Sequence, residues 1–156
     1  MKYWRAPNGG PCLVIADQVL ATFKRYAQNS VLTPEGGGIL LGYVREPHIE
    51  LLDASVPTRW DKQLRSFFDR SAKGHQELAD KRWAESEQLV RYVGEWHTHP
   101  EDHPTPSSVD KRGWAKLAGN RTDQRPVLAI IVGRKSLHVE LVNAQGRAVV
   151  LLEAVE

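Results

Sequence analysis

The chain has 156 residues, a formal net charge of +2 and one cysteine, Cys12. This length predicts a single domain, residues 1–156. A lone cysteine excludes an internal disulfide and is typical of a reducing cytoplasm. No apolar stretch approaches the ~18 residues that cross a bilayer, and no apolar segment follows Lys2 as it would in a secretory signal. We therefore expect a cytoplasmic protein without a membrane partner, and the nearly balanced charge gives no reason to expect nucleic acid.

Apolar periodicity and turn residues divide the chain into interleaved strands and helices. In chain order we expect a strand at 11–16, a helix at 17–27, strands at 39–44 and 49–56, a charged and mostly helical stretch at 65–87, a strand at 90–96, a helix at 107–117, and strands at 127–132, 137–142 and 149–152. Elements interleaved in this way predict an α/β or α+β fold with a mixed sheet.

Two histidines alternate in the segment that ends the predicted strand at 90–96, as His97-Thr98-His99-Pro100. On an extended strand, residues i and i+2 point to the same side, so His97 and His99 present two imidazoles on one face. Asp110, from the helix that follows, can supply an oxygen. Two nitrogens and one carboxylate, with a fourth position open to water, are the ligand set of a catalytic zinc ion. The sequence therefore predicts zinc bound by His97, His99 and Asp110.

These residues also have ordinary structural interpretations. A pair of histidines can simply lie on the surface, and Ser107-x-x-Asp110 has the spacing of a helix capping box. The two roles are compatible for Ser107, whose hydroxyl can cap the helix and still face the site. For Asp110, the neighbouring histidines favour the metal over the backbone.

Glu35 precedes three glycines and an apolar run, a pattern typical of a turn that leads into a buried strand. Glycine lets the backbone approach another group closely, so Glu35 can reach a water molecule on the metal. The alternative is an exposed turn glutamate after Pro34.

Other candidate residues are open to two interpretations. Glu101, Asp102 and His103 either support the site or belong to a solvated loop that shapes substrate entry, and the second is favoured. The aromatic residues Trp60, Phe67 and Phe68 either line a groove for an extended peptide or pack in the core. The remaining histidines and the cysteine are expected at the surface or in the core: His48, His75, His138 and, as a small buried side chain, Cys12.

The set of Glu35, His97-x-His99 and Ser107-x-x-Asp110 resembles the signature of the JAMM (JAB1/MPN/Mov34) zinc metalloproteases, and all five positions are filled. The resemblance extends over about residues 13–132, with residues 59–89 as a modest insertion. It implies an MPN/JAB domain: a curved mixed sheet flanked by helices, related to the cytidine-deaminase-like core. It also implies Glu35 as the general base and Ser107 as a group that stabilises the tetrahedral intermediate.

Within that family, the segment around the histidines and the preceding charged helix most resemble the short bacterial isopeptidases of anti-phage CBASS operons. This implies a protein conjugate with an extended C-terminal tail as substrate, a cGAS-like nucleotidyltransferase among the candidates, and E1- and E2-like operon partners. Two other classes stay open: a metal-free MPN scaffold that only binds partners, and a zinc deaminase or other metal-dependent hydrolase. The deaminases use H-x-E with P-C-x-x-C, which a chain with one cysteine cannot supply.

Overall fold

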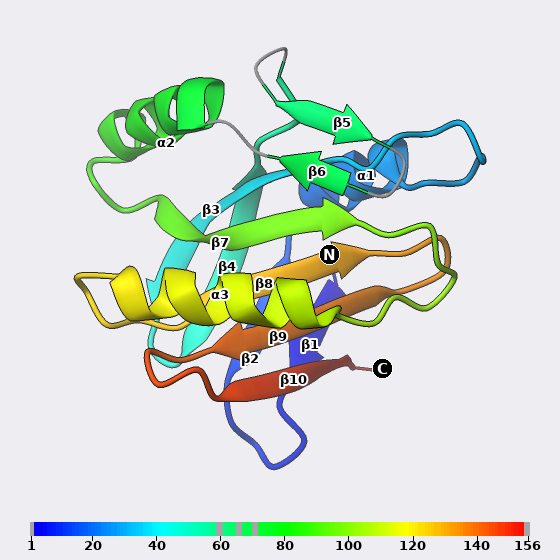
Figure 1. The fold of residues 1–156 in the computed structure, drawn as a ribbon. Coiled ribbons are helices and arrows are strands. Elements are labelled where there is room, and N and C mark those ends of the chain that lie inside the picture. Colours follow the sequence, from blue (N-terminus) through cyan, green and yellow to red (C-terminus); the bar gives the residue numbers. More distant parts are fainter. Residues whose placement is uncertain (1, 59–60, 65–66, 70–71, 155–156) are drawn as a thin grey trace.

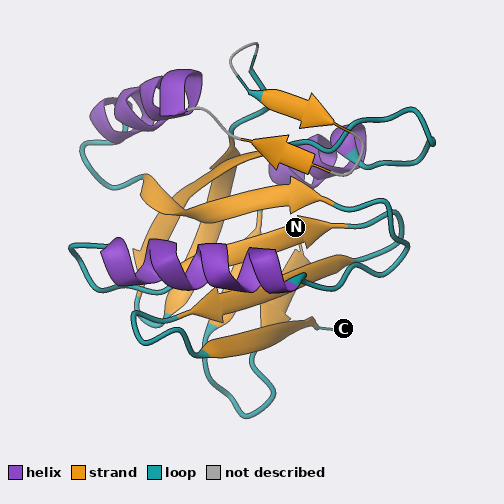
Figure 2. Ribbon diagram, viewed as in Figure 1, coloured by secondary structure: helices purple, strands orange, loops and turns teal. Residues whose placement is uncertain are grey.

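The computed structural model describes residues 2–58, 61–64, 67–69 and 72–154. Within these residues, eight strands form one closed barrel in the order β1-β10-β9-β8-β7-β3-β4-β2 (Figures 1 and 2). The barrel is mixed, because β2 pairs parallel with β4 and β7 pairs parallel with β8, whereas the other neighbours are antiparallel. The strands are β1 (Lys2–Arg5), β2 (Cys12–Ile15), β3 (Gly37–Arg45), β4 (His48–Ala54), β7 (Arg91–Thr98), β8 (Val127–Val132), β9 (Leu137–Val142) and β10 (Ala148–Glu153).

The predicted mixed α/β class is confirmed, and each predicted strand coincides with a strand of the barrel. The sequence did not predict β1. That strand pairs with both β2 and β10 and so closes the sheet on itself. A short strand with a charged residue at each end, Lys2 and Arg5, carries too little apolar alternation to be recognised in the sequence.

Three helices lie around the barrel: α1 (Asp17–Tyr26), α2 (Ala72–Glu85) and α3 (Ser108–Asn120). The predicted helices at 17–27 and 107–117 are confirmed. The helical prediction for 65–87 is wrong at its beginning, because residues 67–69 belong to a separate hairpin of β5 (Lys62–Leu64) and β6 (Phe67–Asp69). Pairing between these strands decides the local conformation, which a thin apolar stripe in the sequence could not reveal. Trp60 and the side chains of Phe67 and Phe68, predicted to line a groove or pack, lie outside the described part of the chain.

The main core fills the inside of the barrel, and α1 adds Val19 and Phe23 to it. A second cluster lies outside, where Trp114 and Ala118 of α3 cover β8 and β9 (Figure 1). All six residues of β8 are therefore buried, as expected for a strand covered on both faces. In the part of the chain that the structure describes, no helix is long and apolar enough to cross a membrane.

The glycine run after Glu35 lets β3 lie close to the chain that leaves β4. A Cβ atom added at Gly38 would lie 2.3 Å from the Ser55 carbonyl oxygen. Ser55 in turn accepts a hydrogen bond from the Ile39 N–H at 2.8 Å and, through its carbonyl, one from Trp96 Nε1 at 3.0 Å. The close approach predicted from the glycines thus holds β3 and β7 together beside the histidines.

Candidate active site

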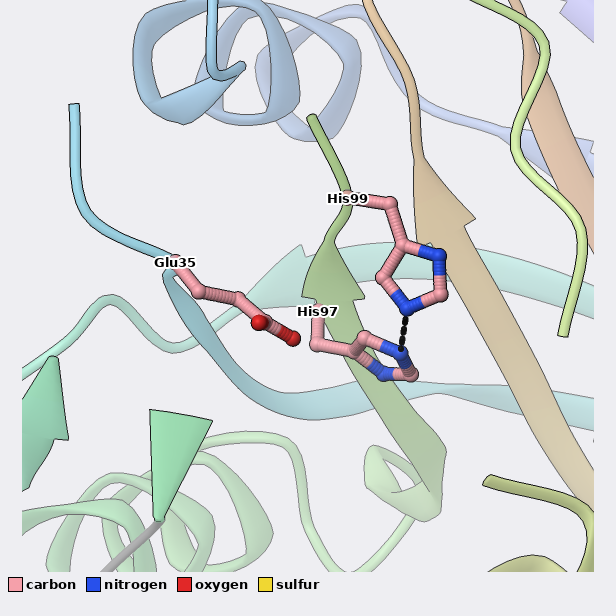
Figure 3. A group of neighbouring side chains, drawn as sticks. All are labelled: Glu35, His97 and His99. Carbon is pink, nitrogen blue, oxygen red and sulfur yellow. Dashed lines mark hydrogen bonds between the residues drawn. The ribbon is translucent and has the colours of Figure 1, made fainter. Parts of the chain in front are cut away.

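The two histidines of the predicted site lie at the carboxyl end of β7. His97 pairs with Gly37 of β3 and with Ile131 of β8. His99 follows one residue beyond the strand and donates its backbone N–H to the Val132 carbonyl at 3.0 Å. The extended backbone turns both imidazoles to the same side, with 3.1 Å between their Nε2 atoms (Figure 3).

Asp110 reaches the same point from the first turn of α3. Its Oδ1 lies 3.3 Å from His97 Nε2 and its Oδ2 lies 3.3 Å from His99 Nε2. Ser107 is the N-cap of α3, and a full capping box is present: Asp110 N–H donates to Ser107 Oγ at 3.0 Å, and Ser107 N–H donates to Asp110 Oδ2 at 2.9 Å. The capping interpretation of this motif is therefore confirmed, and Asp110 also faces the two histidines.

The spacing of the three side chains fits a small tetrahedral ion. Ligand atoms of a tetrahedral ion lie about 1.6 bond lengths apart, so bonds of about 2.0–2.2 Å to zinc require separations of ~3.3–3.5 Å. The separations here are 3.1 Å between the Nε2 atoms of His97 and His99, and 3.3 Å from each of them to an oxygen of Asp110. The two nitrogens approach different oxygens of Asp110, so the three side chains lie close enough together to share a small metal ion such as zinc.

Glu35 lies directly beside these groups and is only 8% exposed, which excludes the exposed-turn alternative. It comes from the loop before β3, and its carboxylate points toward His97 and His99 (Figure 3). Burial raises the pKa of Glu35; the two histidines oppose that rise, and Asp110 adds to it. A carboxyl group whose pKa is moved up toward neutrality is suited to accept and return a proton.

A second metal-binding combination is possible at this point, because ligand atoms of Glu35, His97 and His99 lie within 4.8 Å of one another. Asp110 is the other candidate for the third ligand. Metal ligands must be deprotonated, and the pKa of Asp110 is lowered: burial would raise it, but hydrogen bonds from the two histidines outweigh burial. The pKa of Glu35 moves in the opposite direction.

A family model described as prokaryotic homologs of the JAB domain matches residues 17–146. The chain belongs to this JAB-domain family.

Several relatives of this JAB domain share most of its length. A protein of Pseudomonas aeruginosa named CD-NTase/cGAS isopeptidase is 44% identical over 147 residues, which cover 94% of this chain and 93% of that protein. A protein of the same name from Vibrio cholerae serotype O1 is 38% identical over 80% of this chain and 78% of its own length. The solution structure of a Desulfitobacterium hafniense protein has the same fold, with a TM-score of 0.60 and 16% identity over 91% of this chain and 89% of that one.

The resemblance predicted from the sequence is therefore confirmed, both for the family and for the likeness to bacterial isopeptidases. The five signature residues lie together in the JAB domain. They share one cavity of about 720 Å³, which runs along α3 and is lined among others by Glu35, His97, His99, Ser107, Asp110, Trp114 and Leu117.

Glu101 has a closer connection to the site than the sequence suggested. Its Oε1 lies 2.8 Å from His99 Nδ1, and a carboxylate beside this nitrogen can fix the orientation of the imidazole ring. Glu101 is a partly exposed loop residue at the cavity, as preferred, and it also contacts a site histidine. The alternation of an extended strand does not predict this contact, because the chain bends at Pro100 and Glu101.

The neighbours of Glu101 bond elsewhere. Asp102 pairs with Arg134 at 2.9 Å and with Lys135, while His103 Nδ1 lies 2.9 Å from Ser136 Oγ. These contacts tie the loop after β7 to the turn between β8 and β9. For Asp102 and His103, the interpretation as part of the loop rather than of the site fits the structure.

His75 is buried as the core alternative expected, but it is also part of a polar chain. Its Nδ1 lies 2.5 Å from Ser55 Oγ and its Nε2 lies 2.7 Å from Asp61 Oδ2. This buried chain joins the first turn of α2 to the segment that follows β4. Cys12, by contrast, is only partly buried and is not the buried side chain that was expected, because Leu13 and Ile15 are the residues of β2 that turn into the core.

The other two histidines take part in local structure. His48 Nδ1 accepts the backbone N–H of Cys12 at 3.1 Å. His138 stacks on Trp114 with 6.5 Å between ring centroids, and its Nε2 lies 3.0 Å from Glu140 Oε1. Trp114 also lies 6.0 Å from the ring of His97, so α3 packs against a site histidine as well as the sheet.

Proposed function

We propose that this JAB-domain protein is a zinc-dependent isopeptidase that releases a protein joined through its C-terminal tail to a target amine. The observation that carries the proposal is the cluster of His97, His99 and Asp110 beside the buried carboxyl group of Glu35: the two Nε2 atoms lie 3.1 Å apart, and each lies 3.3 Å from one oxygen of the Asp110 carboxylate. His97, His99 and Asp110 would hold the ion. When bound, zinc would supply Lewis-acid chemistry, which activates water and polarises a carbonyl group.

Each of the other residues at the site has a separate role in the proposed reaction. Glu35 accepts the proton of the attacking water and returns it to the departing lysine ε-amine or peptide amine. Ser107 Oγ accepts the Asp110 N–H, so its own O–H is available to donate to the oxyanion of the tetrahedral intermediate. Glu101 holds the ring of His99 through Nδ1. Trp114 and Leu117 supply apolar walls of the cavity, which limit access of water.

The substrate that fits best is a cGAS-like nucleotidyltransferase conjugated through its C-terminal tail. Three relatives carry the name CD-NTase/cGAS isopeptidase, and the match to this chain covers 78–93% of the length of each. The same proposal places the protein in the cytoplasm, in bacterial antiviral defence of the CBASS type, with E1- and E2-like partners that make the conjugate. A metal-free scaffold would not need two imidazoles and a carboxylate turned toward one point, and a cysteine-ligated deaminase site cannot form with Cys12 on β2.

The decisive experiment uses a fusion whose scissile bond follows the C-terminal tail of a candidate nucleotidyltransferase. Cleavage is followed by intact-protein mass spectrometry, and zinc per chain by elemental mass spectrometry. We expect about one zinc per chain, cleavage that a chelator abolishes, and recovery when zinc is returned. The matched control is His103→Gln, which changes a loop histidine that bonds Ser136 rather than the site. Full cleavage by the metal-stripped protein would contradict the proposal.

A further inference from the structure

Thr98 separates the two site histidines, and its side chain points to the opposite side of β7. The residue is 0% exposed. Its Oγ1 accepts the Gly36 N–H at 2.9 Å and donates to Gln28 Oε1 at 2.9 Å. The backbone adds a third bond, from Thr98 N–H to the Gly36 carbonyl at 2.9 Å. Thr98, which lies between the two histidines, therefore holds Gly36, which follows Glu35.

Gln28 holds the other end of the same loop. It lies two residues after the end of α1 and is 1% exposed. While its Oε1 accepts from Thr98, its Nε2 donates to the Thr33 carbonyl at 3.1 Å. The short segment from Thr33 to Gly36, with Glu35 in it, is thus bound at each end by side chains buried behind the site.

This loop needs such support because it has no regular structure of its own. Residues 33–36 belong to neither α1 nor β3, and the one backbone bond described above, from Thr98 N–H to the Gly36 carbonyl, continues the pairing of β3 with β7. Side-chain bonds from Thr98 and Gln28 add to this single bond. A buried hydrogen bond to a backbone group is costly to leave unmade, so the two residues restrict the loop to one position.

We propose that Thr98 and Gln28 are positioning residues that set the Glu35 carboxylate against His97 and His99. The inference rests on the proposed function, since it concerns the residue that moves the proton. A displacement of about 1 Å in a catalytic group can cost ~10²-fold in rate. Disturbing these hydrogen bonds therefore changes the catalytic step without removing any group that binds metal or substrate.

Thr98→Val tests this directly, because valine keeps the shape of threonine and removes the hydroxyl. We expect kcat to fall by about 10- to 100-fold, with KM within about twofold of wild type and zinc content unchanged. Thr98→Ser keeps the hydroxyl and should restore most of kcat. Gln28→Leu should lower kcat in the same way as Thr98→Val. It provides a second test should the valine variant fold poorly.

A double-variant comparison separates positioning from general weakening of the fold. If Thr98 acts through Glu35, adding Thr98→Val to Glu35→Gln should lower the residual rate by less than about threefold. A merely structural role would give the same loss in both backgrounds, and that result would overturn the proposal.

Hydrogen exchange gives a measurement that needs no substrate. In zinc-loaded Thr98→Val, the amide of Gly36 should lose protection by at least tenfold relative to wild type, while amides in the middle of β8 keep theirs. Unchanged protection of Gly36 would also overturn the inference. If wild type fails to cleave any conjugate, the proposed function fails, and this exchange measurement still decides whether Thr98 fixes the loop.

Discussion

Replacing Ser107 separates the two functions that its hydroxyl group can serve. Ser107 Oγ accepts the Asp110 N–H at 3.0 Å, and the Ser107 N–H donates independently to Asp110 Oδ2 at 2.9 Å. Ser107→Ala removes only the first bond of the capping box. Loss of an N-cap side chain costs about 1 kcal/mol, which for a protein of this size lowers Tm by ~2–4 °C. Zinc binding should survive because Asp110 keeps its backbone partner.

Turnover should respond separately from stability. If the Ser107 hydroxyl stabilises the oxyanion, its removal should slow cleavage by ~10²-fold, far more than a shift of ~1 kcal/mol in a folded protein can explain. Ser107→Gly is the matched control, because glycine at an N-cap costs only a few tenths of a kcal/mol relative to serine and offers no side-chain hydrogen-bond donor. It should recover most of the lost Tm and stay slow, whereas Ser107→Thr should recover both.

The assays are thermal unfolding followed by circular dichroism and cleavage of the tail fusion at equal zinc content. Wild-type turnover in Ser107→Ala together with a lowered Tm would leave the hydroxyl only its capping role. A fast Ser107→Gly enzyme would refute the oxyanion role equally.

Four further changes test other parts of the site and fold. Glu35→Gln should keep zinc and conjugate binding but lower the cleavage rate by ~10²–10⁴-fold, and a wild-type rate would remove Glu35 as the base. Glu101→Gln should weaken zinc affinity by ~10- to 100-fold, measured by competition with a chromogenic chelator; unchanged affinity would show that this bond does not tune the histidine. In the metal-free protein, the pKa of Asp110 is lowered by folding. Its carboxylate therefore stabilises the fold at pH values above ~3.9, the pKa of the Asp side chain in the unfolded state. The stability difference between wild type and Asp110→Asn, from urea unfolding, should therefore shrink as pH falls below ~4, and a difference that grows on acidification would contradict this sign. His75→Ala removes the imidazole that links the buried side chains of Ser55 and Asp61. It should lower the free energy of unfolding by about 2–4 kcal/mol, and a loss below ~1 kcal/mol would show that these hydrogen bonds do not stabilise the fold.

Local spacing explains why the pair of histidines and the helix cap could be predicted from the sequence. His97 and His99 share a side because an extended chain alternates, and Ser107 and Asp110 meet because the N-cap and third residue of a helix meet in a capping box. These relations involve at most four consecutive residues. They hold in the structure whatever the remainder of the chain does.

The position of Glu35 could not be derived in the same way. Its burial depends on Gly36 pairing with Thr98, which is 62 residues away in sequence. Nothing in the local pattern distinguishes a buried loop glutamate from an exposed one, so resemblance to the family was needed to single it out. Gln28 was missed for the same reason, because its bond to Thr98 spans 70 residues.

Barrel closure is a further feature that depends on distant pairing. The strands in the sequence indicated a mixed sheet, but a sheet becomes a barrel only when its two edge strands find a common neighbour. Here β1 provides it, with Trp4 opposite both Leu13 of β2 and Glu153 of β10. Such long-range register is set by the packing of the whole core rather than by any segment of sequence.

The two carboxyl groups of the site illustrate how one fold gives similar groups different tasks. Asp110 stands at the start of α3, where hydrogen bonds from His97 and His99 and from a backbone N–H outweigh burial and lower its pKa. Glu35 stands in a buried loop, where burial outweighs the histidines and raises its pKa. Opposite shifts in neighbouring carboxyl groups separate the acid/base residue from the permanently ionised one. The two histidines thus favour a charged Asp110, as the proposed ligand role requires, and burial of the loop favours proton uptake by Glu35, as the proposed base role requires.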